Sequence, residues 1–138
     1  MVSGSCACKY IQYTTSNPPT RLVNCHCIEC RKQSGAPYLS FVHFPTSSVN
    51  WQTDPTVWKS SETASRTFCP RCGSVLSMSL DKEPDITAIA AGTLDDDKSQ
   101  SSIPTPSAHI FLSEKASWFQ VPDDGAERWV GWPQGTKY

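Results

Sequence analysis

The chain has 138 residues, a length typical of one domain built around one hydrophobic core. Its 12 Lys and Arg side chains are balanced by 13 Asp and Glu, and the formal net charge of −1 argues against nucleic acid or an anionic membrane as a partner. No apolar run approaches the roughly 20 residues needed to cross a bilayer, and the N-terminal segment lacks the basic and apolar parts of a signal peptide. We therefore expect one domain over residues 1–138 in a cytoplasmic protein.

Short β-strand patterns separated by Pro, Gly, Asn, Asp or Ser cover most of the chain. They lie at 8–15, 21–26, 38–44, 49–52, 56–60, 65–69, 74–80, 85–92 and 108–113. One short helix is expected at 27–35, ending at Gly35, and it is too short to be stable unless a metal or packing holds it. Residues 95–107, rich in Asp, Ser and Pro, predict a solvated loop. The sequence thus predicts a mostly β protein.

The cysteines fall into three groups along the chain. They are Cys6 and Cys8, then Cys25, Cys27 and Cys30, then Cys69 and Cys72. An odd number of thiols cannot pair completely within one chain, and in a reducing compartment thiols are more often metal ligands or catalytic groups than disulfides. We therefore interpret all three groups as metal ligands.

The two outer pairs predict a structural zinc site. Cys69 and Cys72 lie on a tight turn, with a proline between them and a glycine after them, in the spacing of half a zinc knuckle. A structural zinc takes four ligands, and Cys6 and Cys8 supply the second pair. The alternative is that one or both pairs are buried apolar cysteines, which is common for single residues but weak for paired spacing.

The triplet Cys25, Cys27 and Cys30 predicts a second zinc site with only three protein ligands. Three ligands plus an open position are the arrangement of a catalytic zinc. The alternative is a structural site that His43 or His109 closes as fourth ligand. Three thiolates make zinc a poorer Lewis acid than three imidazoles do and suit it to a soft incoming donor, so a thiol is the natural occupant of an open position.

Five motifs occur in a fixed order along the chain: GSCAC, CHCIECRKQSGAPY, FCPRCGS, AAGTLDD and HIFLSEKASWF. In this combination the sequence resembles the glutathione-dependent formaldehyde-activating enzymes and their centromere-protein-V-like relatives. The resemblance implies a mostly β, single-domain zinc-binding fold of folded-over antiparallel sheets, the Mss-type zinc β fold, with a structural zinc on the outer pairs and a second zinc on the triplet. It also implies that glutathione is a co-substrate, which adds to formaldehyde to give S-hydroxymethylglutathione.

Two histidines are assigned different roles. Addition of a thiol to a carbonyl needs a general acid that protonates the developing alkoxide, and His109 is the candidate because imidazole titrates near neutral pH. The alternative is a strand histidine that is bonded to a backbone carbonyl. His26 alternates with Cys25 and Cys27 along the chain, so it is expected to point away from them and to be structural.

Three basic side chains are candidates for binding the carboxylates of glutathione. Arg31 and Lys32 follow the last cysteine of the triplet directly, and Lys115 lies in the last motif. The alternative is that they are solvated surface charges. Trp118 and Phe119 are candidates for the wall of a substrate pocket.

Three classes of function remain open. The first is a zinc-dependent carbon–sulfur lyase or synthase that acts on a glutathione adduct, and the second is a zinc-dependent lyase or isomerase of another small electrophile. Both predict a small-molecule substrate and an open second zinc site. The third is a non-catalytic zinc scaffold, which predicts that the second site is closed by a fourth protein ligand.

Overall fold

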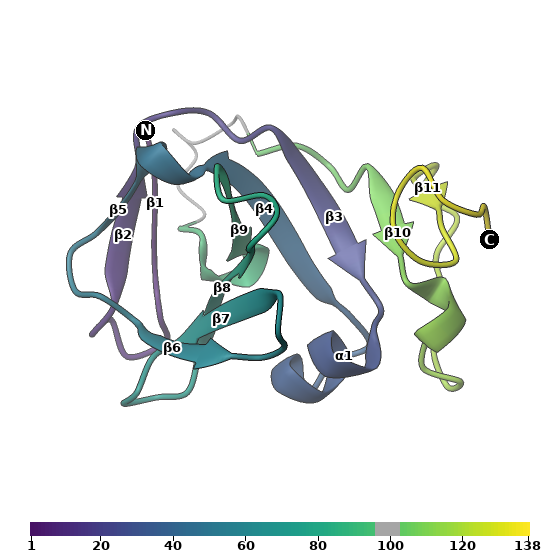
Figure 1. The fold of residues 1–138 in the computed structure, drawn as a ribbon, viewed down its shortest axis with the longest axis horizontal. Helices are drawn as coiled ribbons and strands as arrows, with labels where there is room; N and C mark the ends of the chain where they lie inside the picture. Colours follow the sequence, from purple (N-terminus) through teal and green to yellow (C-terminus); the bar gives the residue numbers. More distant parts are fainter. Residues whose placement is uncertain (96–102) are drawn as a thin grey trace.

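The computed structural model describes residues 1–95 and 103–138, which fold into two β-sheets and one short helix (Figure 1). The small sheet has the order β1-β2-β5 and is antiparallel throughout. Its strands are β1 (Val2–Ser5), β2 (Gln12–Thr15) and β5 (Val49–Trp51). Most of the loop expected at 95–107 lies outside the described residues.

The large sheet has the strand order β11-β10-β3-β4-β9-β8-β7-β6. These strands are β3 (Arg21–Cys25), β4 (Leu39–Pro45), β6 (Thr56–Lys59), β7 (Ala64–Phe68), β8 (Val75–Leu80), β9 (Ile86–Ala90), β10 (Ala108–Ile110) and β11 (Glu127–Arg128). Neighbouring strands are antiparallel except that β10 runs parallel to both β3 and β11. Short 3₁₀ turns occur at Thr46–Ser48 (η1), Ala91–Thr93 (η2) and Leu112–Glu114 (η3).

The small sheet packs against one face of the large sheet. Side chains alternate between the two faces of a strand, and on β3 Leu22 packs with Val2 and Tyr13 of the small sheet. Val23 and Cys25 point to the opposite face and belong to a separate apolar cluster. Each large apolar side chain buried in this way contributes about 1.5–3 kcal/mol to the stability of the fold. The face that carries Cys25 is therefore free of the small sheet.

The helix α1 (Ile28–Ser34) connects the C-terminal end of β3 to the start of β4 and lies below both in Figure 1. Cys27 caps its N-terminus, where the Cys27 sulfur accepts a bond from the backbone N–H of Cys30 at 3.3 Å. Gly35 ends the helix with a left-handed φ of 67°, and its N–H donates to the carbonyl of Arg31 at 2.8 Å. The helix expected at 27–35 is confirmed.

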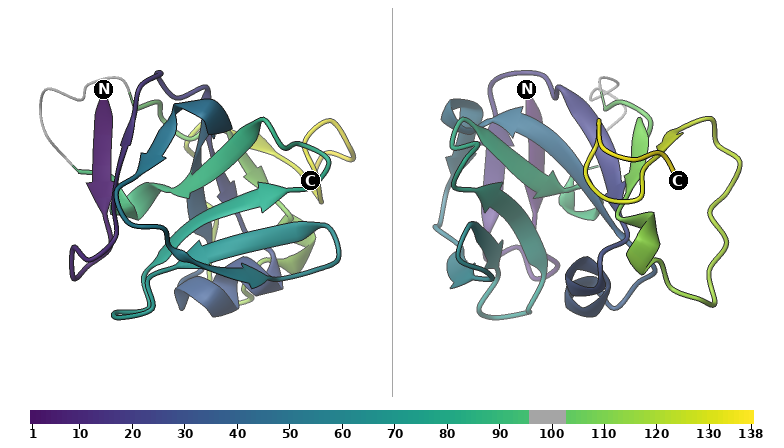
Figure 2. Two further views of the ribbon diagram at one scale, coloured as in Figure 1. Left: turned by 60° about the vertical axis from the view of Figure 1, so that its left-hand side comes forward. Right: turned by 45° about the vertical axis from the view of Figure 1, so that its right-hand side comes forward.

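The expected fold class is confirmed as a mostly β, single-domain structure, and each strand pattern in the sequence overlaps a strand. Two strands, β1 and β11, lie outside the expected patterns, and within the expected antiparallel arrangement only the pairings of β10 with β3 and β11 are parallel among the described strands. Figures 1 and 2 show the N-terminus at the small sheet, and Figure 1 shows the C-terminus beside β11, where the N–H of Tyr138 donates to the carbonyl of Arg128 at 3.0 Å. Within residues 1–95 and 103–138, no helix is long and apolar enough to cross a membrane.

Candidate metal centres

The two outer cysteine pairs lie close together in the structure. The sulfurs of Cys6, Cys8, Cys69 and Cys72 are all within 4.8 Å of one another, and the Cys6–Cys8 and Cys8–Cys69 distances are 3.6 and 3.8 Å. Tetrahedral zinc with Zn–S bonds of about 2.3 Å places its sulfurs about 3.8 Å apart. The four thiols thus fit a zinc ion, and the structural zinc stays a prediction.

Two tight turns direct backbone N–H groups at this outer cluster. Ile11 donates to the sulfur of Cys6 at 3.2 Å, and Arg71 donates to the sulfur of Cys69 at 3.4 Å. Gly73 has a φ of 77°, and its N–H closes the second turn on the carbonyl of Cys69 at 2.9 Å. The guanidinium of Arg71 lies 3.5 Å from the ring centre of Tyr10, so a cation–π contact also joins the two turns.

The triplet is assembled where β3 leads into α1. Cys25 ends the strand, Cys27 caps the helix and Cys30 lies in the first helical turn, and the three sulfurs are within 4.8 Å of one another. Among residues 1–95 and 103–138, no histidine, carboxylate or further cysteine joins them as a fourth ligand. Neither His43 nor His109 therefore closes the site in the way that the structural alternative requires.

The three sulfurs share their protons unequally. Hydrogen bonding to Cys25, and then to Cys30, lowers the pKa of Cys27 to about 2. The corresponding bonds with Cys27 and Cys30 raise the pKa of Cys25. A positive charge placed among the three sulfurs would release these protons, so the electrostatics favour a cation there.

Arg66 of β7 is a functional candidate that the sequence did not indicate. It is 4% exposed, and both of its terminal nitrogens lie 3.4 Å from the sulfur of Cys30. One of them also donates to Gln33 at 2.8 Å, and Nε lies 3.8 Å from the Glu29 carboxylate. This buried cation offsets the negative charge of the thiolates, and no spacing signal in the sequence connects it to them.

A cavity of about 270 Å³, called the cysteine cavity below, opens beside the triplet. Its polar lining comes from Cys25, Cys27, Glu29, Arg66, Glu114, Ser61 and Thr63. Its apolar lining comes from Val23, Phe41, Ala64, Met78, Leu80, Ile110, Phe111 and Trp132. The rings of Phe111 and Trp132 meet edge to face at 4.9 Å between their centres. A small molecule in this cavity would contact two of the three cysteines.

The buried residues His26 and His109 form a hydrogen-bonded network with Asp124, and none of the three is among the described residues that line the cysteine cavity. His26 Nε2 and His109 Nδ1 are 2.9 Å apart, and His109 Nε2 lies 2.8 Å from the Asp124 carboxylate. Burial, and then the charge of His109, lower the pKa of His26 to about 4, while the bond from His109 lowers that of Asp124. His26 points away from the cysteines as expected.

His109 is bonded to side chains rather than to the backbone carbonyl that was the alternative. It alternates with Ile110 on β10, and Ile110 is the residue that lines the cysteine cavity. The general-acid role of His109 stays a prediction, and both ring nitrogens already have partners.

The three basic residues expected to bind carboxylates lie elsewhere. Lys115 donates to the backbone carbonyl of Phe119 at 2.7 Å, Lys32 is exposed on α1, and Arg31 is half-buried beside it. None of the three is among the described residues that line the cysteine cavity. Neither Trp118 nor Phe119 is among the described residues that line the cysteine cavity. Trp118 is 71% exposed, and the ring centre of Phe119 lies 6.1 Å from that of the buried His26.

Two curated relatives resemble the chain. One is an uncharacterized lyase of Schizosaccharomyces pombe, 33% identical over 73 residues, and this match spans about half of each protein, 53% in both cases. The other is a Halomonas elongata protein named provisionally as a glutathione-dependent formaldehyde-activating enzyme, 23% identical over 96% of this chain and 89% of the relative.

A solved structure and a family model also match. The crystal structure of a Rhodobacter sphaeroides protein superposes with a TM-score of 0.58 at 17% identity, over 75% of this chain and 97% of the other, which shows a shared fold. The model of the family described as glutathione-dependent formaldehyde-activating enzyme matches residues 1–114. Since this match covers most of the 138 residues, the chain belongs to the glutathione-dependent formaldehyde-activating enzyme family.

Proposed function

We propose that the protein is a zinc-dependent carbon–sulfur lyase or synthase that acts on a glutathione adduct of the S-hydroxymethylglutathione type. One observation carries the proposal: the sulfurs of Cys25, Cys27 and Cys30 converge beside a cavity, and within the described part of the chain no fourth protein ligand joins them. Family membership and the names of the two relatives support the same reaction class.

The donor set fits zinc. Three thiolates within 4.8 Å of one another match the preference of zinc for sulfur, and they leave a tetrahedral position for an exogenous ligand. Zinc bound there would supply a Lewis acid that lowers the pKa of a thiol to near neutrality. Arg66, through its contacts with Cys30, would reduce the net negative charge that three thiolates impose.

The residues of the cysteine cavity supply the remaining steps. The glutathione S–H bond breaks, its proton passes to a carboxylate, and the sulfur forms a bond to the formaldehyde carbon while the carbonyl electron pair moves to oxygen. Returning the proton to that oxygen gives S-hydroxymethylglutathione, and the reverse sequence is the lyase reaction. Glu114, which lines the cavity and accepts a bond from the N–H of Ile28 at 3.3 Å, is our candidate for this proton carrier in preference to His109, which is not among the described residues that line the cavity.

The apolar wall of the cavity favours the same chemistry. Val23, Phe41 and Ile110 belong to one core cluster with Cys25, and all three line the cavity beside the sulfurs. Such a wall excludes water and holds the thiol and the carbonyl in proximity, which contributes most of the rate gain when little covalent chemistry falls to the protein.

Cobalt substitution followed by optical titration tests the proposal. Glutathione should change the thiolate-to-cobalt charge-transfer band of the triplet site, and S-methylglutathione, which has no thiol, should leave the band unchanged. The same preparation should accelerate formation of S-hydroxymethylglutathione from glutathione and formaldehyde, and Cys27→Ser should abolish this acceleration. If both ligands leave the band unchanged, the thiol-adduct reaction has no physical basis in this protein.

The two alternatives make different predictions. A lyase or isomerase of another electrophile would keep the open site but would show no band change with glutathione. A non-catalytic scaffold would hold its second zinc with four protein ligands. It would bind neither glutathione nor S-methylglutathione at the metal.

A further inference from the structure

A second cavity of about 310 Å³, called the charged cavity, lies directly beside the cysteine cavity. The two share Val23, Met78, Leu80, Ile110 and Trp132 as lining residues. A ligand that enters the cysteine cavity can therefore extend into the charged cavity along one continuous wall.

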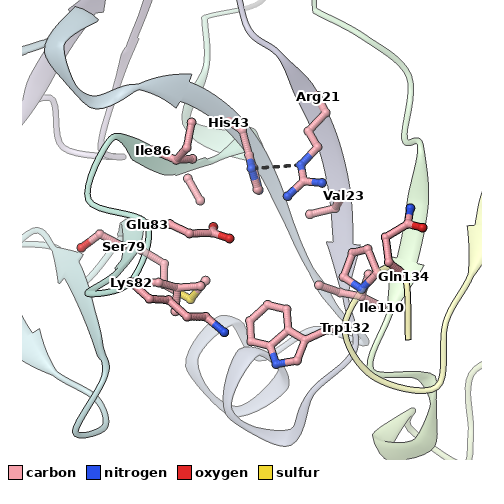
Figure 3. A pocket seen from close by; sticks show the side chains of 14 residues that line it. Arg21, Val23, His43, Ser79, Lys82, Glu83, Ile86, Ile110, Trp132 and Gln134 are labelled. Carbon is pink, nitrogen blue, oxygen red and sulfur yellow. Dashed lines mark hydrogen bonds between the residues drawn. The ribbon is translucent and has the colours of Figure 1, made fainter. Parts of the chain in front are cut away.

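Three charged side chains point into the charged cavity from its edges (Figure 3). Arg21 comes from β3, and Lys82 and Glu83 come from the turn between β8 and β9. That turn is held by two backbone bonds, from Glu83 to Leu80 at 3.0 Å and from Ile86 to Glu83 at 3.1 Å. Among the described residues, none of the three charged groups forms an ion pair within 4.0 Å, although Lys82 lies 5.4 Å from the centre of the Trp132 ring.

Arg21 is oriented by a neighbour on β4. Its Nε donates to His43 Nδ1 at 3.2 Å, which leaves its two terminal nitrogens directed into the cavity (Figure 3). Burial, and then the charge of Arg21, lower the pKa of His43 to about 4, so His43 is a neutral acceptor at neutral pH. The guanidinium is therefore held in place while its bidentate end remains available.

Strand β3 sets the distance between Arg21 in the charged cavity and Cys25 in the cysteine cavity. Arg21, Val23 and Cys25 occupy alternate positions of β3 and share a face, with Arg21 and Cys25 about 13 Å apart along an extended strand. From the cysteinyl sulfur of glutathione to the α-carboxylate of its γ-glutamyl end is about 10 Å in an extended chain. Glutathione with its sulfur beside Cys25 would thus bring its γ-glutamyl α-carboxylate within reach of the Arg21 side chain.

We infer that the charged cavity recognises the amino-acid ends of the thiol substrate, with Arg21 and Lys82 binding its two carboxylates and Glu83 its ammonium group. The inference rests on the proposed function, because the sulfur must lie at the triplet. Glutathione carries two carboxylates and one ammonium, and the cavity is lined by two cations, Arg21 and Lys82, and one anion, Glu83. Thiols that lack a γ-glutamyl end, such as 2-mercaptoethanol, cannot span the two cavities and gain nothing from these charges.

Calorimetric titration of the zinc-loaded protein with S-methylglutathione tests the inference. This ligand keeps all three charges but has no thiol, so its affinity reports on the charged cavity rather than on bonding to zinc. Arg21→Met, Lys82→Met and Glu83→Gln should each weaken its binding by about tenfold. Arg21→Lys keeps the charge and should lose less, which separates a lost contact from a misfolded protein.

A second ligand isolates the ammonium contact. Blocking the amino group, in N-acetyl-S-methylglutathione, should weaken binding to the wild-type protein and should have no further effect on Glu83→Gln. Lys32→Met, which removes the same charge from α1, serves as the comparison for Lys82→Met. If Lys32→Met weakens binding and Arg21→Met and Lys82→Met do not, the tripeptide lies along α1 and the inference is overturned.

Turnover separates this inference from the proposed function. If the protein turns over S-hydroxymethylglutathione and the three variants keep the wild-type KM, the charged cavity is not the recognition site and the proposed function stands. If turnover is absent while S-methylglutathione binds and the three variants weaken it, the reaction is wrong and the recognition site stands. If the proposed function and the recognition site are both correct, the three variants should raise KM for the glutathione adduct without lowering kcat. Their reaction with 2-mercaptoethanol should be unaffected.

Discussion

Replacing Arg66 with Met removes a buried cation that contacts the triplet through Cys30 and keeps most of the packing of its side chain. Sulfur is a weak hydrogen-bond acceptor, so we assign the two 3.4 Å contacts with Cys30 together about 2 kcal/mol, near the low end for a bond to a charged group. The 2.8 Å bond to Gln33 adds about 1 kcal/mol. Arg66→Met should therefore lower the free energy of unfolding by about 3 kcal/mol, within the range for breaking a buried ion pair.

The assay is urea unfolding of the zinc-loaded protein, followed by chelator competition at the triplet site. Arg66→Lys is the matched control: it keeps the charge but replaces two nitrogens by one, so it should lose about half as much stability. Arg66→Met should also release the triplet zinc at a lower chelator concentration, because the net negative charge on three thiolates is no longer offset. The outer site should be unaffected.

Two outcomes would refute the reasoning. If Arg66→Met unfolds within about 0.5 kcal/mol of the wild type, the contacts with Cys30 and Gln33 carry no net energy. If stability falls but zinc release is unchanged, Arg66 is a packing residue and the charge argument fails.

Three further predictions concern the cysteine clusters and pH. Cys69→Ser should unfold the domain by circular dichroism, whereas Cys27→Ser should abolish turnover and leave the fold; a globally unfolded Cys27→Ser would indicate that the triplet is structural. Chelator titration with metal analysis should release two zinc ions in separate steps, and a single cooperative step with unfolding would contradict an open second site. Burial, and then the charge of Arg21, lower the pKa of His43 from 6.5 to about 4 in the folded protein. The unfolded chain therefore binds a proton at a higher pH than the folded protein does. The contribution of His43 to the free energy of unfolding is complete above pH 6.5 and is lost as the pH falls towards 4. The loss should reach about 3 kcal/mol and should be absent in His43→Gln, as measured by urea unfolding at pH 7 and pH 4.5.

The strands and the sorting of the cysteines could be predicted because their signals are local. A period of two with turn residues between runs marks a strand wherever it occurs, and the turn at Cys69 and Cys72 depends only on the residues within it. The helix after Cys27 was predictable for the same reason, since its cap and its terminal Gly35 lie within a few residues of each other.

The remaining features depend on contacts between distant residues. Arg66 meets Cys30 across 36 residues, and the Asp124 partner of His109 comes from an irregular segment after η3. Strand β1 carries no periodic signal, because its Gly4 is required for a close approach: a Cβ there would collide with Tyr13 and with the backbone of Thr93. Parallel pairing of the short strand β10 likewise leaves no trace in its own sequence.

Other long-range contacts link the outer cluster to the candidate active site. Cys6 and Cys8 follow β1 and Cys69 follows β7, so a zinc ion among them would tie the small sheet to the large one. The small sheet in turn packs on Leu22 and thereby fixes which face of β3 is buried beneath it. A slip of one residue in β3 would turn Cys25 and Arg21 together to the wrong face. A zinc ion in the outer cluster would therefore support the proposed function by holding β3 in register, since β3 carries both the triplet residue Cys25 and Arg21, which is proposed to bind the far end of the substrate.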